Sequence, residues 1–132
     1  MKYFTINELC RSSTAALRGI DNTPNEEIKR NLTTLVDKVL DPLREAWGKP
    51  LVISSGYRCP ELNKAVGGSK TSHHMRGMAA DLDTGDRTEN RKLYNLVLSL
   101  NLPFTQLIDE HNFDWVHISL DPANVKRQQL KL

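Results

Sequence analysis

The 132-residue sequence has few of the features that mark membrane, secreted or disulfide-rich proteins. No apolar run approaches the roughly 20 residues of a transmembrane helix, and Asn7 and Glu8 interrupt the apolar start that a signal peptide would need. Only two cysteines occur, Cys10 and Cys59, which excludes a disulfide framework and predicts buried free thiols. We therefore expect cytoplasmic synthesis without a signal peptide, and no membrane partner.

Neither sign of charge dominates. Eighteen basic and sixteen acidic residues leave a net charge of +2, which does not indicate a dedicated nucleic-acid surface. Lys126, Arg127 and Lys131 are interspersed with Gln and Leu, and we interpret them as a solvated terminus. The content of 39% hydrophobic and 26% charged residues is typical of globular proteins. We expect one domain over residues 1–132, acting as a monomer.

The first fifty residues carry two helical patterns. Thr5 and Glu8 have the spacing of a capping box, which predicts a short first helix. Thr23, Pro24 and Glu26 combine an N-cap with a proline and a first-turn acid, which predicts a longer helix. The apolar positions of this longer helix recur at three- and four-residue steps and should share one buried face: Ile28, Leu32, Leu35, Val36, Val39, Leu40 and Leu43.

The rest of the chain predicts short strands around one helix. Residues 51–53 form a short apolar run typical of a buried strand, residues 79–83 are predicted to be a second strand, and Thr88 can cap a helix that follows. Residues 105–108 and 114–120 can pair as a hairpin. Because helices come first and no regular alternation of strand and helix follows, we predict an α+β fold with a small antiparallel sheet packed against helices.

Four histidines are present, and two of them are adjacent in a loop-like stretch. Residues 67–77 are rich in Gly, Ser and Thr, a composition typical of loops, where functional residues often lie. A catalytic zinc ion needs three His or carboxylate ligands and a fourth position free for water. His74 in this loop and Asp81 on the next strand can supply two ligands, with Asp83 on the same strand face as the competing candidate.

The last predicted strand carries another histidine. Alternation along residues 114–120 directs Trp115 and His117 to one face of the sheet and Asp114 to the other. For Asp114 to act beside His117, the strand must begin with a bend or bulge at residues 112–114. We expect such an irregularity at this point.

Three segments of the sequence resemble motifs of one family of peptidases. Residues 72–81 resemble the S-x-H-x-x-G-x-A-x-D signature of the zinc D-alanyl-D-alanine metallopeptidase family, also called M15. Residues 114–117 resemble its acidic-x-x-His motif, and residues 54–58 resemble its S-G-Y-R segment. One such motif is a weak signal, whereas three in the correct order are a strong one.

The resemblance implies a hedgehog/DD-peptidase-like fold and a role for each motif residue. His74, Asp81 and His117 would hold Zn²⁺, and Asp114 would be the general base. Arg58 would be a second catalytic side chain, which stabilises the oxyanion or grips a substrate carboxylate.

Three further residues are assigned to substrate binding: Ser72, His111 and Trp115. Packing is the competing role for Trp115, because aromatic residues beside a ligand are often part of the core. Some subfamilies carry a histidine where this sequence has Asn112, and His111 can replace it only if the loop bends.

The resemblance implies zinc-dependent hydrolysis of peptidoglycan stem peptides. Members of the family act as D-Ala-D-Ala carboxypeptidases or as endopeptidases, and the sequence leaves both open. The alternative is a non-catalytic, zinc-containing module that binds peptidoglycan, because fold and ligands do not guarantee turnover. We expect action on the cell wall after release, as in phage or prophage lysis.

Overall fold

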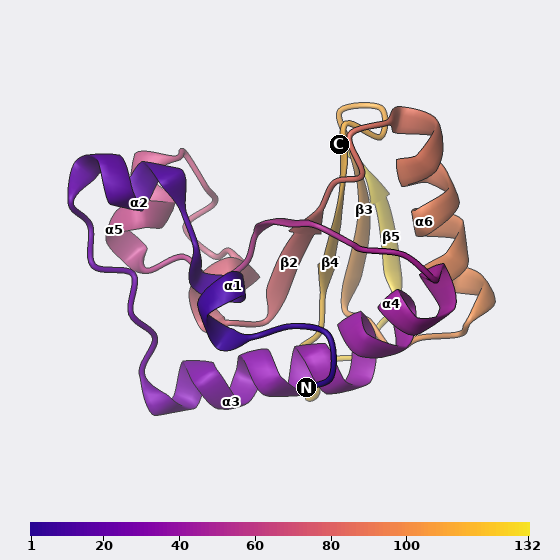
Figure 1. Ribbon diagram of the computed structural model, residues 1–132, viewed down its shortest axis with the longest axis horizontal. Helices are drawn as coiled ribbons and strands as arrows, with labels where there is room; N and C mark the ends of the chain where they lie inside the picture. The colour runs from indigo at the N-terminus through magenta and orange to yellow at the C-terminus, as the bar shows by residue number, and fades with distance from the viewer.

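The computed structural model describes all 132 residues. The first 47 residues contain five helical segments, and the last three of these follow one another directly as one helical rod (Figure 1). These segments are α1 (Ile6–Cys10), α2 (Ser13–Arg18), α3 (Glu26–Leu35), the π-helical η1 (Val36–Leu40) and α4 (Asp41–Trp47). Pro42 lies in the first turn of α4, directly after the π-helical segment. The N–H that this proline lacks does not end the rod there.

Five strands form one sheet in the order β1-β2-β4-β3-β5. They are β1 (Ile53–Ser55), β2 (Ala79–Leu82), β3 (Gln106–Glu110), β4 (Trp115–Ser119) and β5 (Gln128–Lys131). The predicted hairpin is present as antiparallel β3 and β4, but β5 pairs with β3 in parallel. The α+β class is therefore confirmed, and the sheet is antiparallel as predicted except for the parallel pairing of β5 with β3.

Three shorter elements complete the fold: α5 (Pro60–Ala65), the 3₁₀ helix η2 (His73–Arg76) and α6 (Arg87–Ser99). No helix combines the length and the apolar character needed to cross a membrane.

In two of the three helices with a predicted N-cap, the observed N-cap lies two residues away from the predicted residue. Thr5 caps α1 as predicted, but α3 is capped by Asn25 and not by Thr23, and α6 is capped by Asp86 and not by Thr88. In all three helices the cap side chain accepts a hydrogen bond from the amide N–H three residues further on. The hydroxyl of Thr23 instead donates to the carboxylate of Asp21, two residues earlier.

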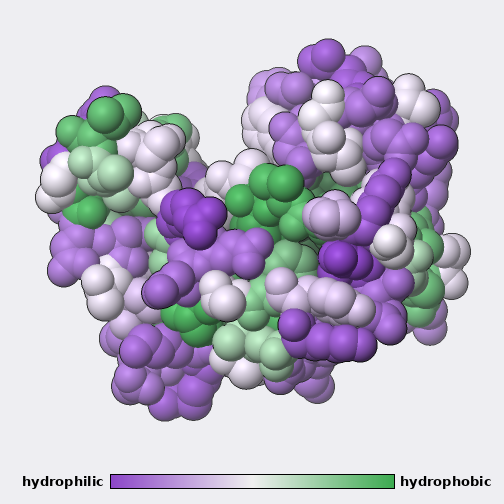
Figure 2. Space-filling model, in the orientation of Figure 1, coloured by the Kyte–Doolittle hydropathy of each residue, from purple (hydrophilic) through white to green (hydrophobic).

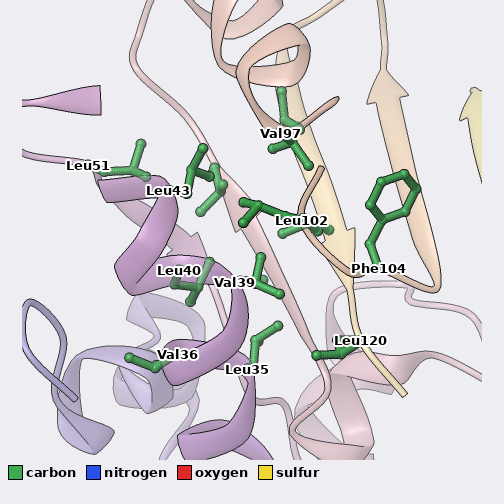
Figure 3. Packing of buried hydrophobic residues seen from close by; sticks show 14 of the residues in the cluster. Leu35, Val36, Val39, Leu40, Leu43, Leu51, Val97, Leu102, Phe104 and Leu120 are labelled. Carbon is green, nitrogen blue, oxygen red and sulfur yellow. The ribbon is translucent and has the colours of Figure 1, made fainter. Parts of the chain in front are cut away.

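The hydrophobic core lies between the helical rod, α6 and one face of the sheet (Figures 1 and 3). The predicted apolar positions from Leu32 to Leu43 are buried, and Ile28 is half-buried at the edge. The sheet contributes alternate residues to this face: Ala80, Leu82, Leu107, Val116 and Ile118. Because strand residues alternate in direction, the residues between these face away from the core, where they can form a site.

The carboxyl-terminal segment is part of the packed structure. The guanidinium of Arg127 donates to the carbonyl of Leu102 and lies 4.4 Å from the ring centroid of Phe104. Lys131 is in register with Asp109 on β3. The prediction of a solvated segment therefore holds for the exposed side chains of Lys126 and Lys131, but it is wrong for Arg127 and for the β5 backbone, which have specific partners.

Candidate metal centre

His74, Asp81 and His117 converge on the face of the sheet that lies away from the core. Asp81 on β2 and His117 on β4 are direct partners in the antiparallel register, and η2 brings His74 over them. His74 Nε2 lies 3.2 Å and His117 Nδ1 lies 3.0 Å from the same oxygen, Asp81 Oδ1. The exposed fractions of the three residues are 2%, 9% and 9%. One donor atom from each lies within 4.8 Å of the others, so the group can hold a metal ion.

The loop before β2 fixes the orientation of His74. Its Nδ1 donates to the carbonyl of Gly56 at 2.7 Å, because a carbonyl can only accept, and Nε2 therefore faces Asp81. Ser72 accepts a hydrogen bond from the His74 amide at 3.1 Å and caps η2. Gly77 ends η2 with a φ of +70°, and a Cβ there would lie 2.9 Å from the Ile28 carbonyl oxygen. The motif glycine thus permits both the turn and the contact with α3.

The charges at this point fit a bound cation. Because Nδ1 of His74 is engaged by the Gly56 carbonyl, Nε2 is the atom that faces the Asp81 carboxylate, and Nδ1 of His117 faces the same oxygen. Although burial favours the neutral form of Asp81, hydrogen bonds from His117 and His74 hold the pKa of this carboxyl below its ordinary range. Two imidazoles and an ionised carboxylate form a donor set that zinc accepts. The hydrogen bond from His74 to Gly56 is the outer-shell contact that orients such a ligand.

The competing ligand Asp83 lies outside this group. Its Oδ1 accepts hydrogen bonds from the Gly85 amide at 2.8 Å and from Asn90 Nδ2 at 3.1 Å. Asp83 therefore stabilises the turn before α6, and the geometry favours Asp81 as the metal-binding carboxylate.

Arg58 lies beside the triad formed by the three candidate ligands, His74, Asp81 and His117. Its Nη2 is 3.8 Å from Asp81 Oδ2, and its Nη1 donates to Asn63 Oδ1 at 3.2 Å. Burial lowers the pKa of this guanidinium, and the charge of Asp81 opposes that shift. Its Nε is buried without a partner. Asn63 was not identified from the sequence, because a buried amide within a short helix has no distinctive motif.

A cavity of about 670 Å³ opens over the triad. Ser72, His111 and Trp115, which the sequence assigned to substrate binding, all contribute to its lining, together with Arg58. The rings of His111 and Trp115 lie 5.1 Å apart between centroids. The structure therefore brings these side chains to the same cavity as the candidate ligands.

Asp114 does not line this cavity. The chain turns before β4 through three consecutive left-handed residues, His111, Asn112 and Phe113, with φ between 51° and 61°. This is the irregular start that the sequence required. It nevertheless leaves Asp114 exposed, with Oδ1 3.6 Å from Arg87 Nη2 on α6. The Asp114 carboxylate therefore lies at the side of the sheet that α6 covers.

Glu110 is the carboxylate that lines the cavity next to the candidate ligands. It ends β3, it is in register with Trp115, and it shares the cavity lining with Ile108 and His117. Residues diagonal to each other on adjacent strands have Cβ atoms about 7 Å apart, so long side chains at Glu110 and His117 can reach a common point. Only the register of β3 and β4 reveals this placement, so no motif in the sequence predicts it.

Comparison with known proteins agrees with the geometry of this site. A family model described as Peptidase M15 matches residues 2–119. A zinc D-Ala-D-Ala carboxypeptidase of Streptomyces albus G is 43% identical over 49 residues. That match covers 36% of this chain and 19% of the relative, so it spans about a fifth of the relative's length. Because the family model matches nearly the whole chain, the predicted family is confirmed and the protein belongs to the peptidase M15 family.

Proposed function

We propose that this protein is a zinc-dependent peptidase that hydrolyses peptide bonds in peptidoglycan stem peptides, with His74, Asp81 and His117 as the zinc ligands. The observation that carries the proposal is the convergence of two imidazoles and one carboxylate at the floor of an open cavity. Three protein ligands leave the fourth zinc position for water, which is the arrangement of a catalytic site and not of a structural one. Family membership and the relative's name, which specifies D-Ala-D-Ala, support the substrate class.

A bound zinc ion would supply Lewis acidity, which acidifies a coordinated water and polarises the scissile carbonyl. The protein's own residues then have defined tasks. His74 and Asp81 are held by Gly56 and by the strand pairing, so the donor set is preorganised. Arg58 carries its charge at the edge of the cavity, where it can stabilise the oxyanion or bind a substrate carboxylate. Loss of one such donor commonly costs about 3 to 4 kcal/mol in the transition state.

Two carboxylates compete for the role of general base. The motif assigns this role to Asp114, and that assignment stays a prediction. The position of Glu110 in the cavity lining favours it, since a base must come within hydrogen-bond reach of the proton that it takes. In either case the carboxylate would accept a proton from water and return it to the leaving amine.

Replacing each of the two candidate bases, Glu110 and Asp114, tests the proposal directly. We expect zinc-loaded protein to cleave purified stem peptides, with new termini identified by mass spectrometry. Glu110→Gln and Asp114→Asn each remove one carboxylate, and neither should reduce zinc content. The general base is the residue whose replacement lowers kcat by about 100-fold or more while zinc remains bound. If neither replacement lowers kcat, no carboxylate acts as the base in the way described.

The alternative is a zinc-containing peptidoglycan-binding module that does not cleave. The open cavity and the nearby carboxylate and guanidinium favour the enzyme. The same assay separates the two: stem peptides that bind to zinc-loaded protein but remain intact after prolonged incubation would support the binding module and reject the peptidase.

A further inference from the structure

A second cavity, of about 720 Å³, adjoins the cavity over the triad at Arg58. The two cavities share Arg58, Val66 and Asp81 in their linings. Asp81 therefore borders both cavities, whereas His74 and His117 line only the cavity over the triad. The surface is visibly hollowed between the lobe that carries α2 and α5 and the body of the sheet (Figure 2).

The wall of this second cavity is the free edge of the sheet. β1 pairs only with β2, and the residues from Pro50 to Ser55 line the cavity. The start of α2 forms the opposite wall, where Ser13 and Thr14 contribute to the lining. Unpaired strand edges bind extended peptides through main-chain hydrogen bonds, and side-chain pockets add specificity.

Exposed apolar side chains occur along this path. Val52 is 60% exposed and Val66 is 46% exposed. Both line the second cavity, and the 63% exposed Leu132 lines the cavity over the triad. The charged residues that line the second cavity, apart from the candidate ligand Asp81, are two arginines, Arg11 and Arg58, and one acid, Glu8. The lining thus suits a peptide with apolar side chains and carboxylates.

We propose that this cavity holds the part of a peptidoglycan peptide that continues beyond the cleaved bond, bound in extended form along the edge of β1. A carboxypeptidase needs room for only one residue on one side of the metal, whereas a groove open on both sides accommodates a continuing chain. The protein is therefore an endopeptidase. This inference rests on the proposed function and specifies its substrate class.

A pair of variants on α2 tests the groove. Ser13→Trp places a large side chain into the second cavity, while Leu17→Trp adds the same side chain at a position on the same helix that is 88% exposed and lines neither cavity. The substrates are a stem peptide that ends one residue after the cleaved bond and the same peptide extended by several residues. For the wild type and Leu17→Trp we expect kcat/KM to be about tenfold or more higher for the extended peptide. For Ser13→Trp we expect this ratio to fall to about one.

A binding measurement separates failure of the groove from failure of the catalytic proposal. The extended peptide added to metal-free protein should shift the NMR amide signals of Val52 and Ser54, and Ser13→Trp should abolish these shifts. Equal cleavage of both peptides by the wild type, together with unchanged signals at Val52 and Ser54, would overturn the groove but leave the peptidase intact. The absence of any cleavage by zinc-loaded protein would overturn the proposed function and this inference together.

Discussion

Gly56 links the fold to the metal centre, and replacing it with alanine should weaken both. Its carbonyl accepts the hydrogen bond from His74 Nδ1 that orients this imidazole. A Cβ at residue 56 would lie 2.1 Å from the backbone oxygen of Leu9, far inside van der Waals contact. Because the obstacle is backbone and not a flexible side chain, α1 or the loop that holds Gly56 must move.

The size of the effect follows from these two contacts. Overpacking of this kind typically costs about 1 to 3 kcal/mol of unfolding free energy. In a chain of this length, that loss corresponds to a fall in Tm of about 4 to 12 °C. Disturbing an outer-shell hydrogen bond of a metal ligand commonly lowers metal affinity about 10- to 100-fold. We expect both losses in Gly56→Ala.

The assays are thermal unfolding of the metal-free protein and zinc titration against a competing chelator. Gly19→Ala is the matched control, because Gly19 has a φ of +65° but a Cβ at this residue would meet no atom within 4 Å. It should lose about 1 kcal/mol of stability from the strained backbone and keep wild-type zinc affinity. If Gly56→Ala kept wild-type affinity and Tm, the coupling between α1, Gly56 and His74 would be refuted.

Three further outcomes are expected. Asn90→Ala should cost about 2 to 4 kcal/mol in urea unfolding, because the buried amide donates to the carbonyls of Phe113 and Asp114 and fixes the turn before β4; an unchanged midpoint would contradict this role. Burial raises the pKa of Cys10 to about 11. In a Cys59→Ser background, alkylation of Cys10 at pH 9 should therefore be at least about tenfold slower in the folded protein than in the unfolded chain. Equal rates would show that the Cys10 thiol is solvated. The unfolded thiol ionises near pH 9 while folded Cys10 keeps its proton, so its contribution to stability is complete below pH 9 and declines as the pH rises toward 11. Zinc at 100 times its Kd should add about 2.7 kcal/mol to the unfolding free energy, and a Tm insensitive to chelators would be inconsistent with a zinc site in the folded state.

The candidate ligands could be predicted from the sequence because their spacing is local or conforms to a motif. His74 and Asp81 belong to one loop-to-strand unit. His117 belongs to the motif of residues 114–117, on the strand that pairs with the strand of Asp81. What the sequence could not give is the register that places Asp81 opposite His117. The same missing register hid Glu110, whose direction depends on which residues of β3 and β4 face each other.

The fold class could be predicted, but several element boundaries could not. Asn25 and Thr23 are both capable N-caps, and only tertiary packing decides between them. β5 has a single large apolar residue, Leu130, in a polar segment, so its pairing with β3 leaves little trace in the hydrophobic pattern. α5 was missed for a similar reason, since six residues with Leu62 as the main buried apolar side chain give no clear period.

Zinc-edge X-ray absorption on the one-to-one zinc complex tests the central claim most directly. We expect a first shell of two imidazole nitrogens at about 2.0 Å with oxygen atoms completing it, and loss of one imidazole in His117→Ala. Sulfur scattering at about 2.3 Å, or a spectrum that His74→Ala and His117→Ala leave unchanged, would contradict the assignment of these side chains as the zinc ligands.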